Sequence, residues 1–375
     1  MPGCPPALDH SPFNPPRFTS FQKFERIINI MSPVTKDQVL QALSGVMDPE
    51  LRKDLVTLKM IKDVEVQDST VSFTVELTTP ACPLRTQIQK DAENAVLALD
   101  GVDSVNVTMG ARVPQDEKIT DLTIRNIIAV GSGKGGVGKS TIAVNLAVAL
   151  AECGAKVGLM DADIYGPNVP MMMGVNALPP TPQGKKIQPA EAYGVKVMSI
   201  GFMVTTGQPL IWRGPMLHSA IKQFLMDVDW GELDYLVVDL PPGTGDVQLS
   251  LMQTVPLSGG VVVTMPQQVS FDDAARAVAM FKKMKVPVLG IVENMSYLEM
   301  PDGSRRALFG EGGGEQLARA AGAPLLANIP IDEKVGAGGD SGKPVVVSDP
   351  GSAAAVVMNA LAMDVAARMS MEISG

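Results

Sequence analysis

The stretch GSGKGGVGKST at residues 131–141 constrains this chain more than any other part of the sequence. Residues 133–140 fit the pattern G-x-x-x-x-G-K-[ST], in which glycines let backbone N–H groups turn toward phosphate oxygens. An apolar run, IIAVGS, precedes the loop, and a helical pattern, TIAVNLAVALAEC, follows it. The helix N-terminus adds positive potential at the phosphates. The sequence therefore predicts a nucleotide site between a strand and a helix.

This loop is expected to hold ATP and Mg²⁺. Lys139 should reach the β- and γ-phosphates, and Ser140 should hold the magnesium ion. The expected nucleotide contacts within the loop are Gly133, Gly135, Gly136, Val137, Gly138, Lys139, Ser140 and Thr141. One feature is unusual, because Lys134 adds a second lysine to a loop that needs only one.

Two acidic motifs belong to the same predicted machinery. The run DYLVVD ends in Asp239, which is placed to order the magnesium ion, and PPGTGD follows as a loop that can sense the γ-phosphate. In DADIYGPN, Asp161 and Asp163 are separated by one residue at a strand end, so they point to different sides. We assign Asp163 to positioning the attacking water and Asp161 to bracing the loop.

Beyond residue 123, strand patterns alternate with helical patterns. The strand-like runs are IIAVGS, KVGLMD, LDYLVVDL, VVVTM, VPVLGIVEN and PLLANIP. This alternation favours an α/β fold, a mostly parallel doubly wound P-loop NTPase sheet over residues 124–375. The last helical pattern, SAAAVVMNALAMDVAARM, lacks a basic excess, so we expect it to dock on the sheet rather than lie on a membrane.

Residues 33–110 predict a small α+β domain in front of this sheet. TKDQVLQALSGV has helical spacing, VSFTVEL at 71–77 alternates as a strand does, and VDSVNVTM reads as a second strand. A helical stripe runs from residue 84 to residue 99, with Pro83 suited to its first position. Cys82 is then expected at the helix N-cap, where the helix dipole lowers a thiol pKa. Residues 111–123 are polar and read as a linker.

Composition excludes several classes of protein. A net charge of −9 argues against a nucleic-acid partner, and the sequence has no apolar run of about 18 residues that would span a membrane. The three cysteines, Cys4, Cys82 and Cys153, are too scattered for a disulfide framework, which favours a reducing, cytoplasmic compartment. Residues 1–32 hold six prolines in their first 16 positions and read as a disordered tail. A transit peptide and a second start at Met31 are the alternatives.

The motifs carry a specific resemblance. GKGGVGKST, with a lysine directly after the first glycine, resembles the deviant Walker A motif of the MinD/ParA/nitrogenase-iron-protein superfamily. WGELDYLVVDLPPGTGD, DADIYGPNVP, ENMSY and LFGEGGG resemble the Mrp/ApbC iron-sulfur cluster carrier family. The front segment, with DPEL and ELTTPACPL, is similar to the SufT-like domain that precedes the ATPase in many members. The likeness covers nearly all of residues 33–365.

The resemblance implies a Mg²⁺-dependent ATPase that carries iron-sulfur clusters, with apoprotein clients and scaffold proteins as partners. It implies a face-to-face homodimer in which Lys134 reaches the partner's nucleotide, as an arginine finger supplied in trans does. It also implies that Asn294 of ENMS hydrogen-bonds the adenine edge. The loop IPIDEKV, which includes Asp332, resembles the segment that flanks the base.

One departure from the family concerns the cluster itself. Between ENMSY and LFGEGGG the family commonly holds a C-P-x-C pair that ligates a cluster at the dimer interface, but here Met300 and Gly303 occupy those places. Neither residue replaces a thiolate. Cys82 is then the candidate for cluster or thiol chemistry, with the cluster bound transiently. The alternatives are a MinD/ParA-like positioning ATPase, a scaffold that binds nucleotide without turnover, and an adaptor that holds no cluster.

Overall fold

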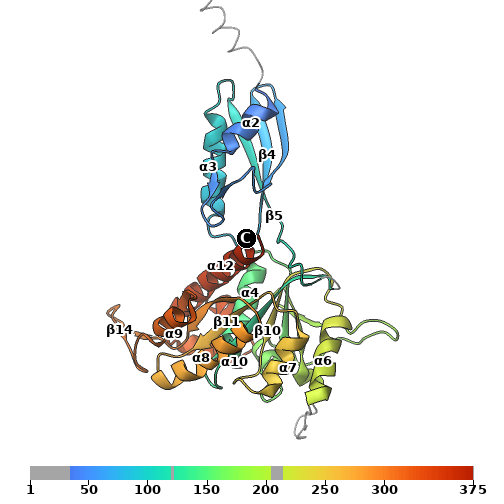
Figure 1. Ribbon diagram of the computed structural model, residues 1–375, viewed down its shortest axis with the longest axis vertical. Helices are drawn as coiled ribbons and strands as arrows, with labels where there is room; N and C mark the ends of the chain where they lie inside the picture. Colours follow the sequence, from blue (N-terminus) through green and yellow to red (C-terminus); the bar gives the residue numbers. More distant parts are fainter. Residues whose placement is uncertain (1–33, 120–121, 204–213, 375) are drawn as a thin grey trace, which may run out of the picture.

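The computed structural model describes residues 34–119, 122–203 and 214–374. The predicted tail of residues 1–32 and Cys4 lie outside the described residues. Figure 1 shows a smaller N-terminal part standing above a larger α/β part, with the end of helix α12 near the junction. The strands on either side of the predicted linker end at Ala111 and begin at Ile124.

The N-terminal part is a three-stranded sheet with two helices. Thr35 starts the first helix with a capping box, since its side chain accepts from the Gln38 backbone N–H and the Gln38 side chain accepts in return. The middle strand buries every second side chain, as its alternating sequence predicts. The elements are α2 (Lys36–Leu43), β1 (Met47–Asp48), β2 (Lys53–Asp54), β3 (Ile61–Gln67), β4 (Thr70–Leu77), α3 (Arg85–Leu97) and β5 (Ser104–Ala111).

The helix after β4 begins later than the sequence predicts. Its N-cap is Leu84 and its first residue is Arg85, so both Pro83 and Cys82 precede the helix. The prediction that Cys82 caps this helix is therefore wrong, and so is the expected lowering of its thiol pKa. Burial, with a smaller contribution from the nearby carboxylate of Glu50, raises the pKa of the Cys82 thiol to about 11.

The larger part is built on an eight-stranded sheet with the order β15-β12-β11-β6-β10-β7-β9-β8. The strand pairs are parallel except for β8 with β9, which confirms the predicted mostly parallel sheet. The strand before the phosphate loop is central, with β10 on one side and β11 on the other. The strands are β6 (Ile124–Ser132), β7 (Val157–Asp161), β8 (Ala190–Ala192), β9 (Val195–Ser199), β10 (Leu233–Asp239), β11 (Gly259–Thr264), β12 (Val288–Glu293) and β15 (Leu325–Asn328).

Helices cover both faces of this sheet, as a doubly wound fold requires (Figure 1). Ile128 and Val130 of β6 pack into the core beneath α4 and α12, whereas Ile127 and Ala129 pack into the core on the opposite face. The strand is therefore apolar on both sides. The helices are α4 (Lys139–Glu152), α6 (Gly214–Met226), α7 (Asp246–Thr254), α8 (Gln268–Lys283), α9 (Gly313–Ala321) and α12 (Ala353–Ser374).

Shorter elements complete the larger part. They are α5 (Val169–Met172), a 3-10 helix (Ile200–Met203), the hairpin of β13 (Leu298–Glu299) and β14 (Arg305–Arg306), α10 (Glu333–Asp340) and α11 (Val345–Ser348). Contrary to the expectation from the sequence, the segment Ala353–Ile373 within α12 is long and apolar enough to cross a membrane, but 56% of its apolar window is buried inside the protein. This helix packs against α4 and β15, as the docked helix predicted from the sequence should.

The two parts of the chain touch near the start of β10. The buried hydroxyl of Tyr235 lies 3.1 Å from the Thr79 hydroxyl, and the Ser370 hydroxyl donates to the Thr78 carbonyl at 3.4 Å. Ala81 joins the core that contains α4. The loop that carries Cys82 is therefore held against the larger part.

Candidate functional site

The phosphate loop lies between the end of β6 and the start of α4. Gly136 and Gly138 have left-handed backbone conformations, with φ of 78° and 85°, which glycine adopts at low cost. Gly133 is needed for a different reason, since a Cβ there would lie 2.0 Å from the Asp273 carbonyl group of α8. Helix α8 therefore packs directly against the back of the loop.

Lys139 lies at the centre of a compact polar cluster. Its ammonium group contacts Asp239 Oδ1 at 2.6 Å and Asp163 Oδ2 at 3.5 Å. The Ser140 hydroxyl donates to Asp239 Oδ2 at 2.6 Å. Lys139 is 6% exposed and Asp239 1%, so these charges face one another with little water between them. The structure thus brings together the predicted lysine, serine and both carboxylates at the carboxyl edge of the sheet.

The carboxylates occupy different environments. Burial raises the pKa of Asp239, while the Lys139 charge opposes that shift. Burial also raises the pKa of Asp161, and the charge of Asp239 adds to the shift. The ionised forms of Asp161 and Asp239 are therefore both disfavoured by their surroundings, although the charge of Lys139 opposes both shifts.

Asp161 binds the loop that follows β7. It accepts from the Ser199 hydroxyl at 2.8 Å and from the backbone N–H groups of Asp163 at 3.1 Å and Val169 at 3.4 Å. Asp163 instead faces Lys139. The sequence analysis missed Ser199, although the apolar run VKVMS marks a strand that ends at this edge.

The donor set fits Mg²⁺ bound together with a nucleotide. Ser140 and Asp239 offer oxygen atoms, which are the ligands that magnesium prefers. Across the described residues, no group of three or more His, Cys, Asp or Glu side chains could hold a metal ion. Magnesium commonly binds through one or two carboxylates plus substrate phosphates, so the nucleotide completes such a site.

A cavity of about 480 Å³ lies beside the first turn of α4. Asn294 lines it, but its amide also donates to the Val137 carbonyl of the phosphate loop at 2.9 Å. Asp332 caps α10 at the rim by accepting from the Lys334 N–H. The cavity is thus lined by both residues that the sequence analysis expects near the adenine, Asn294 and Asp332. Its lining also includes Thr141, Met172, Pro330 and Ile331.

Lys134 and the PPGTGD loop are both hydrogen-bonded to Ser132, the last residue of β6. The Ser132 hydroxyl donates to the Lys134 carbonyl at 2.9 Å, and the Gly243 N–H donates to the Ser132 carbonyl at 3.0 Å. The Lys134 side chain is half-buried and forms no ion pair with any residue that the structure describes. Its ammonium group is therefore not committed to a carboxylate within this part of the chain.

Met300 and Gly303, which stand where the family commonly has its cysteine pair, lie in the turn of the β13–β14 hairpin. The Gly303 N–H donates to the Met300 carbonyl at 2.8 Å, and Gly303 has a φ of 80°. Arg305 lies 4.2 Å from the centre of the Tyr297 ring. This turn provides no thiolate. In the described residues, the free cysteines are Cys82 and Cys153, and burial raises the pKa of both thiols.

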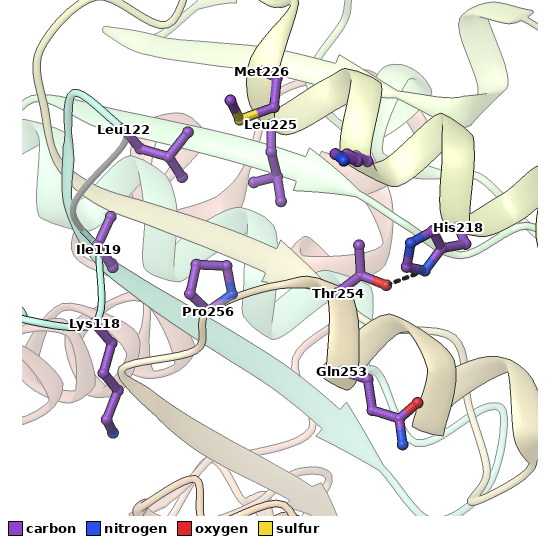
Figure 2. A pocket seen from close by; sticks show the side chains of 10 residues that line it. Lys118, Ile119, Leu122, His218, Leu225, Met226, Gln253, Thr254 and Pro256 are labelled. Atoms are coloured by element: carbon purple, nitrogen blue, oxygen red, sulfur yellow. Dashed lines mark hydrogen bonds between the residues drawn. The ribbon is translucent and has the colours of Figure 1, made fainter.

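A second cavity, of about 320 Å³, lies between α6, α7 and the segment before β6 (Figure 2). Figure 2 shows the His218 ring hydrogen-bonded to the Thr254 hydroxyl at 2.7 Å. None of the predicted site residues lines this cavity. It is therefore separate from the nucleotide site.

Comparison with protein-family models gives two matches. Residues 123–366 match the model of the NUBPL iron-transfer P-loop NTPase. Residues 36–109 match the model described as an iron-sulfur cluster assembly protein. The matches fall on the two parts of the fold.

Known proteins resemble the chain over most of its length. An iron-sulfur cluster carrier protein of Synechocystis is 53% identical, over 90% of this chain and 99% of that protein. One of Deinococcus radiodurans is 50% identical, over 89% and 96%. The chloroplastic Fe-S cluster assembly factor HCF101 of rice is 47% identical, and the match spans 84% of this chain but 60% of that protein.

Among solved structures, the nucleotide-binding protein of Archaeoglobus fulgidus in complex with ADP is 41% identical, with a TM-score of 0.52. That match covers 59% of this chain and 88% of the other. The chain therefore belongs to the NUBPL iron-transfer family of P-loop NTPases, preceded by an iron-sulfur cluster assembly domain.

Proposed function

We propose that this protein is a Mg²⁺-dependent ATPase that carries iron-sulfur clusters to apoproteins in the cytoplasm. The observation that carries the ATPase proposal is the convergence of Lys139, Ser140, Asp163 and Asp239 at one strand edge. The proposal that the cargo is an iron-sulfur cluster is supported by the names of the relatives, which are iron-sulfur cluster carrier proteins. We also propose domain limits of residues 33–110 and 124–375, joined by residues 111–123.

The loop supplies the groups that bind the triphosphate. The backbone N–H groups of residues 133–141 and the N-terminus of α4 attract the phosphate oxygens, and Lys139 neutralises the β- and γ-phosphates. For this, Lys139 exchanges its 2.6 Å contact with Asp239 for phosphate. Ser140 and Asp239 would hold Mg²⁺, which neutralises charge on the transferring phosphoryl group. Asn294 and Asp332 then face the adenine from the adjoining cavity.

Hydrolysis needs a positioned water and a further cation. Asp163 lies 3.5 Å from the Lys139 ammonium group, which supports our assignment of Asp163 to orient the attacking water. We propose that Lys134 contacts the nucleotide of the second subunit in a face-to-face homodimer. There its positive charge offsets the negative charge that spreads over the phosphoryl group during transfer. Ordering of the 241–245 loop by the γ-phosphate would favour this dimer, and hydrolysis would release it.

A phosphate-release assay tests the ATPase proposal. The wild-type protein should release phosphate from ATP only when Mg²⁺ is present. Lys139→Ala should lose both ATP binding and turnover, because it removes the cation that faces the phosphates. Equal phosphate release by both proteins would contradict the assignment.

Cys82 is the proposed thiol for the cluster, because it is the cysteine that the family-like TTPACPL motif carries. Burial raises its pKa to about 11, so iron must displace the proton when the thiolate binds. Anaerobic reconstitution with iron and sulfide, followed by metal and sulfide assay, tests this assignment. The wild type should retain iron and sulfide, and Cys82→Ala should lose them. A matched Cys153→Ala variant should behave as the wild type does.

An adaptor that holds no cluster of its own is the second candidate function. The hairpin turn at Met300 and Gly303 favours it, because that turn lacks the family's thiolates. The same reconstitution distinguishes the two. An adaptor would retain no iron in either the wild type or Cys82→Ala, yet would still hydrolyse ATP.

A further inference from the structure

Gln248 is a buried side chain whose polar atoms have no hydrogen-bond partner in the described part of the chain. It is the third residue of α7 and is 2% exposed. Neither its Oε1 nor its Nε2 forms a hydrogen bond within the described residues. A buried amide without partners destabilises a fold, and an apolar side chain of the same size would avoid that cost. The amide therefore needs an explanation beyond packing.

The location of Gln248 supplies one. A Cβ on Gly131 would lie 3.6 Å from Gln248 Nε2, so the amide lies against the strand end that leads into the phosphate loop. Helix α7 directly continues the loop 241–245, which follows Asp239. The Gly243 N–H of this loop is bonded to the Ser132 carbonyl. Gln248 thus lies between the 241–245 loop and the end of β6, so a movement of this loop would change the surroundings of its amide.

The loop itself has room to move. Thr244 and Gly245 are exposed, and a Cβ on Gly243 or Gly245 would meet no atom within 4 Å. Helix α8, on the same face of the sheet, carries a similar group in its first turn, because the Ser270 hydroxyl is buried and has no partner within the described residues. Two helices behind the phosphate loop therefore carry polar groups that this conformation leaves unbonded.

We propose that Gln248 is a positioning residue of the ATP-bound form. When the γ-phosphate orders the 241–245 loop, the first turn of α7 shifts, and the amide donates to and accepts from backbone groups at the junction of this loop with β6. These bonds hold the loop closed over the triphosphate. ADP lacks the γ-phosphate, so it does not recruit them. The inference rests on the proposed ATPase function.

Gln248→Met tests it, because methionine keeps the unbranched shape of glutamine and removes both polar atoms. Binding of Mg²⁺ with a non-hydrolysable ATP analogue, and with ADP, is measured by calorimetry on the full chain. We expect about tenfold weaker binding of the analogue, equivalent to two ordinary hydrogen bonds, and ADP binding within about twofold of the wild type. The melting temperature of the nucleotide-free variant should equal or exceed that of the wild type.

Met252→Leu is the matched control, since Met252 is 3% exposed on the same helix and the exchange changes no polar group. It should bind both nucleotides as the wild type does. Equal loss of analogue and ADP binding in Gln248→Met, unchanged analogue binding, or a large fall in melting temperature would overturn the inference. A wild type that binds no analogue would refute the proposed ATPase function as well, which separates the two failures.

Discussion

Replacing Asp239 by asparagine separates two roles of that carboxylate, the ion pair with Lys139 and the proposed binding of Mg²⁺. Asparagine keeps the shape and its oxygen can still accept from Lys139, whereas its amide N–H would donate to the Ser140 oxygen in place of the bond that the carboxylate accepts. The main loss is the charge. At an effective dielectric constant of about 20, the 2.6 Å pair of Lys139 with Asp239 is worth roughly 6 kcal/mol. The 3.5 Å pair with Asp163, which remains, is worth roughly 5 kcal/mol.

Two effects offset the lost attraction. Because burial raises the pKa of Asp239, folding disfavours its ionised form, and removing that charge returns free energy. Asp239 also repels Asp161, whose pKa it raises. Lys139 keeps one partner, so the loss should fall below the roughly 3–5 kcal/mol of a fully broken buried pair. We expect Asp239→Asn to lower the free energy of unfolding by about 1–3 kcal/mol.

The nucleotide site should respond more strongly than the fold. Urea unfolding measures stability, and calorimetry with Mg²⁺ and ATP measures binding. We expect Asp239→Asn to remain folded but to lose Mg²⁺-dependent ATP binding by at least about tenfold, since it removes a charged ligand. The control, Asp163→Asn, should bind Mg²⁺ and ATP but lose turnover. Wild-type ATP affinity in Asp239→Asn, or its unfolding, would refute the reasoning.

Three further predictions concern single positions. Gly133→Ala should lose about 1–3 kcal/mol of stability and weaken ATP binding, because its Cβ would lie 2.0 Å from a helix backbone. Gly245→Ala, whose Cβ would meet no atom within 4 Å, should keep the stability of the wild type. In a variant with the other two cysteines changed to serine, Cys82 should be alkylated about a hundredfold more slowly at pH 8 than a thiol of pKa 9.0. Its alkylation rate should keep rising toward pH 11, and a plateau near pH 9 would contradict the raised pKa. Lys134→Ala should bind ATP normally yet release little phosphate, and unchanged turnover would rule out its role in trans.

The sequence predicted the parts of this molecule that depend on local pattern. The phosphate loop needs glycines at fixed spacing between a strand and a helix, and Gly136 and Gly138 adopt the left-handed conformations that this implies. The alternation of β4 and the two-sided apolar runs of the large sheet also have local causes. Asp239 was found because a buried strand ends at that carboxylate.

The remaining features depend on contacts between distant segments. Cys82 was misplaced because Pro83 suits a first helical position, while the actual helix begins at Arg85. The raised pKa of Cys82 arises from burial, which no local pattern reports. Ser199 reaches Asp161 only because β9 pairs with β7 in the folded sheet. The contact of Tyr235 with Thr79 joins residues 156 positions apart.

Light scattering in the presence of nucleotide tests the central claim most directly. Asp163→Asn, which should bind ATP without turning it over, is measured with Mg²⁺ and ATP, with Mg²⁺ and ADP, and without nucleotide. We predict a particle of twice the chain mass with ATP. An Asp163→Asn protein that stays a single subunit with Mg²⁺ and ATP, although the wild type hydrolyses ATP, would contradict the account.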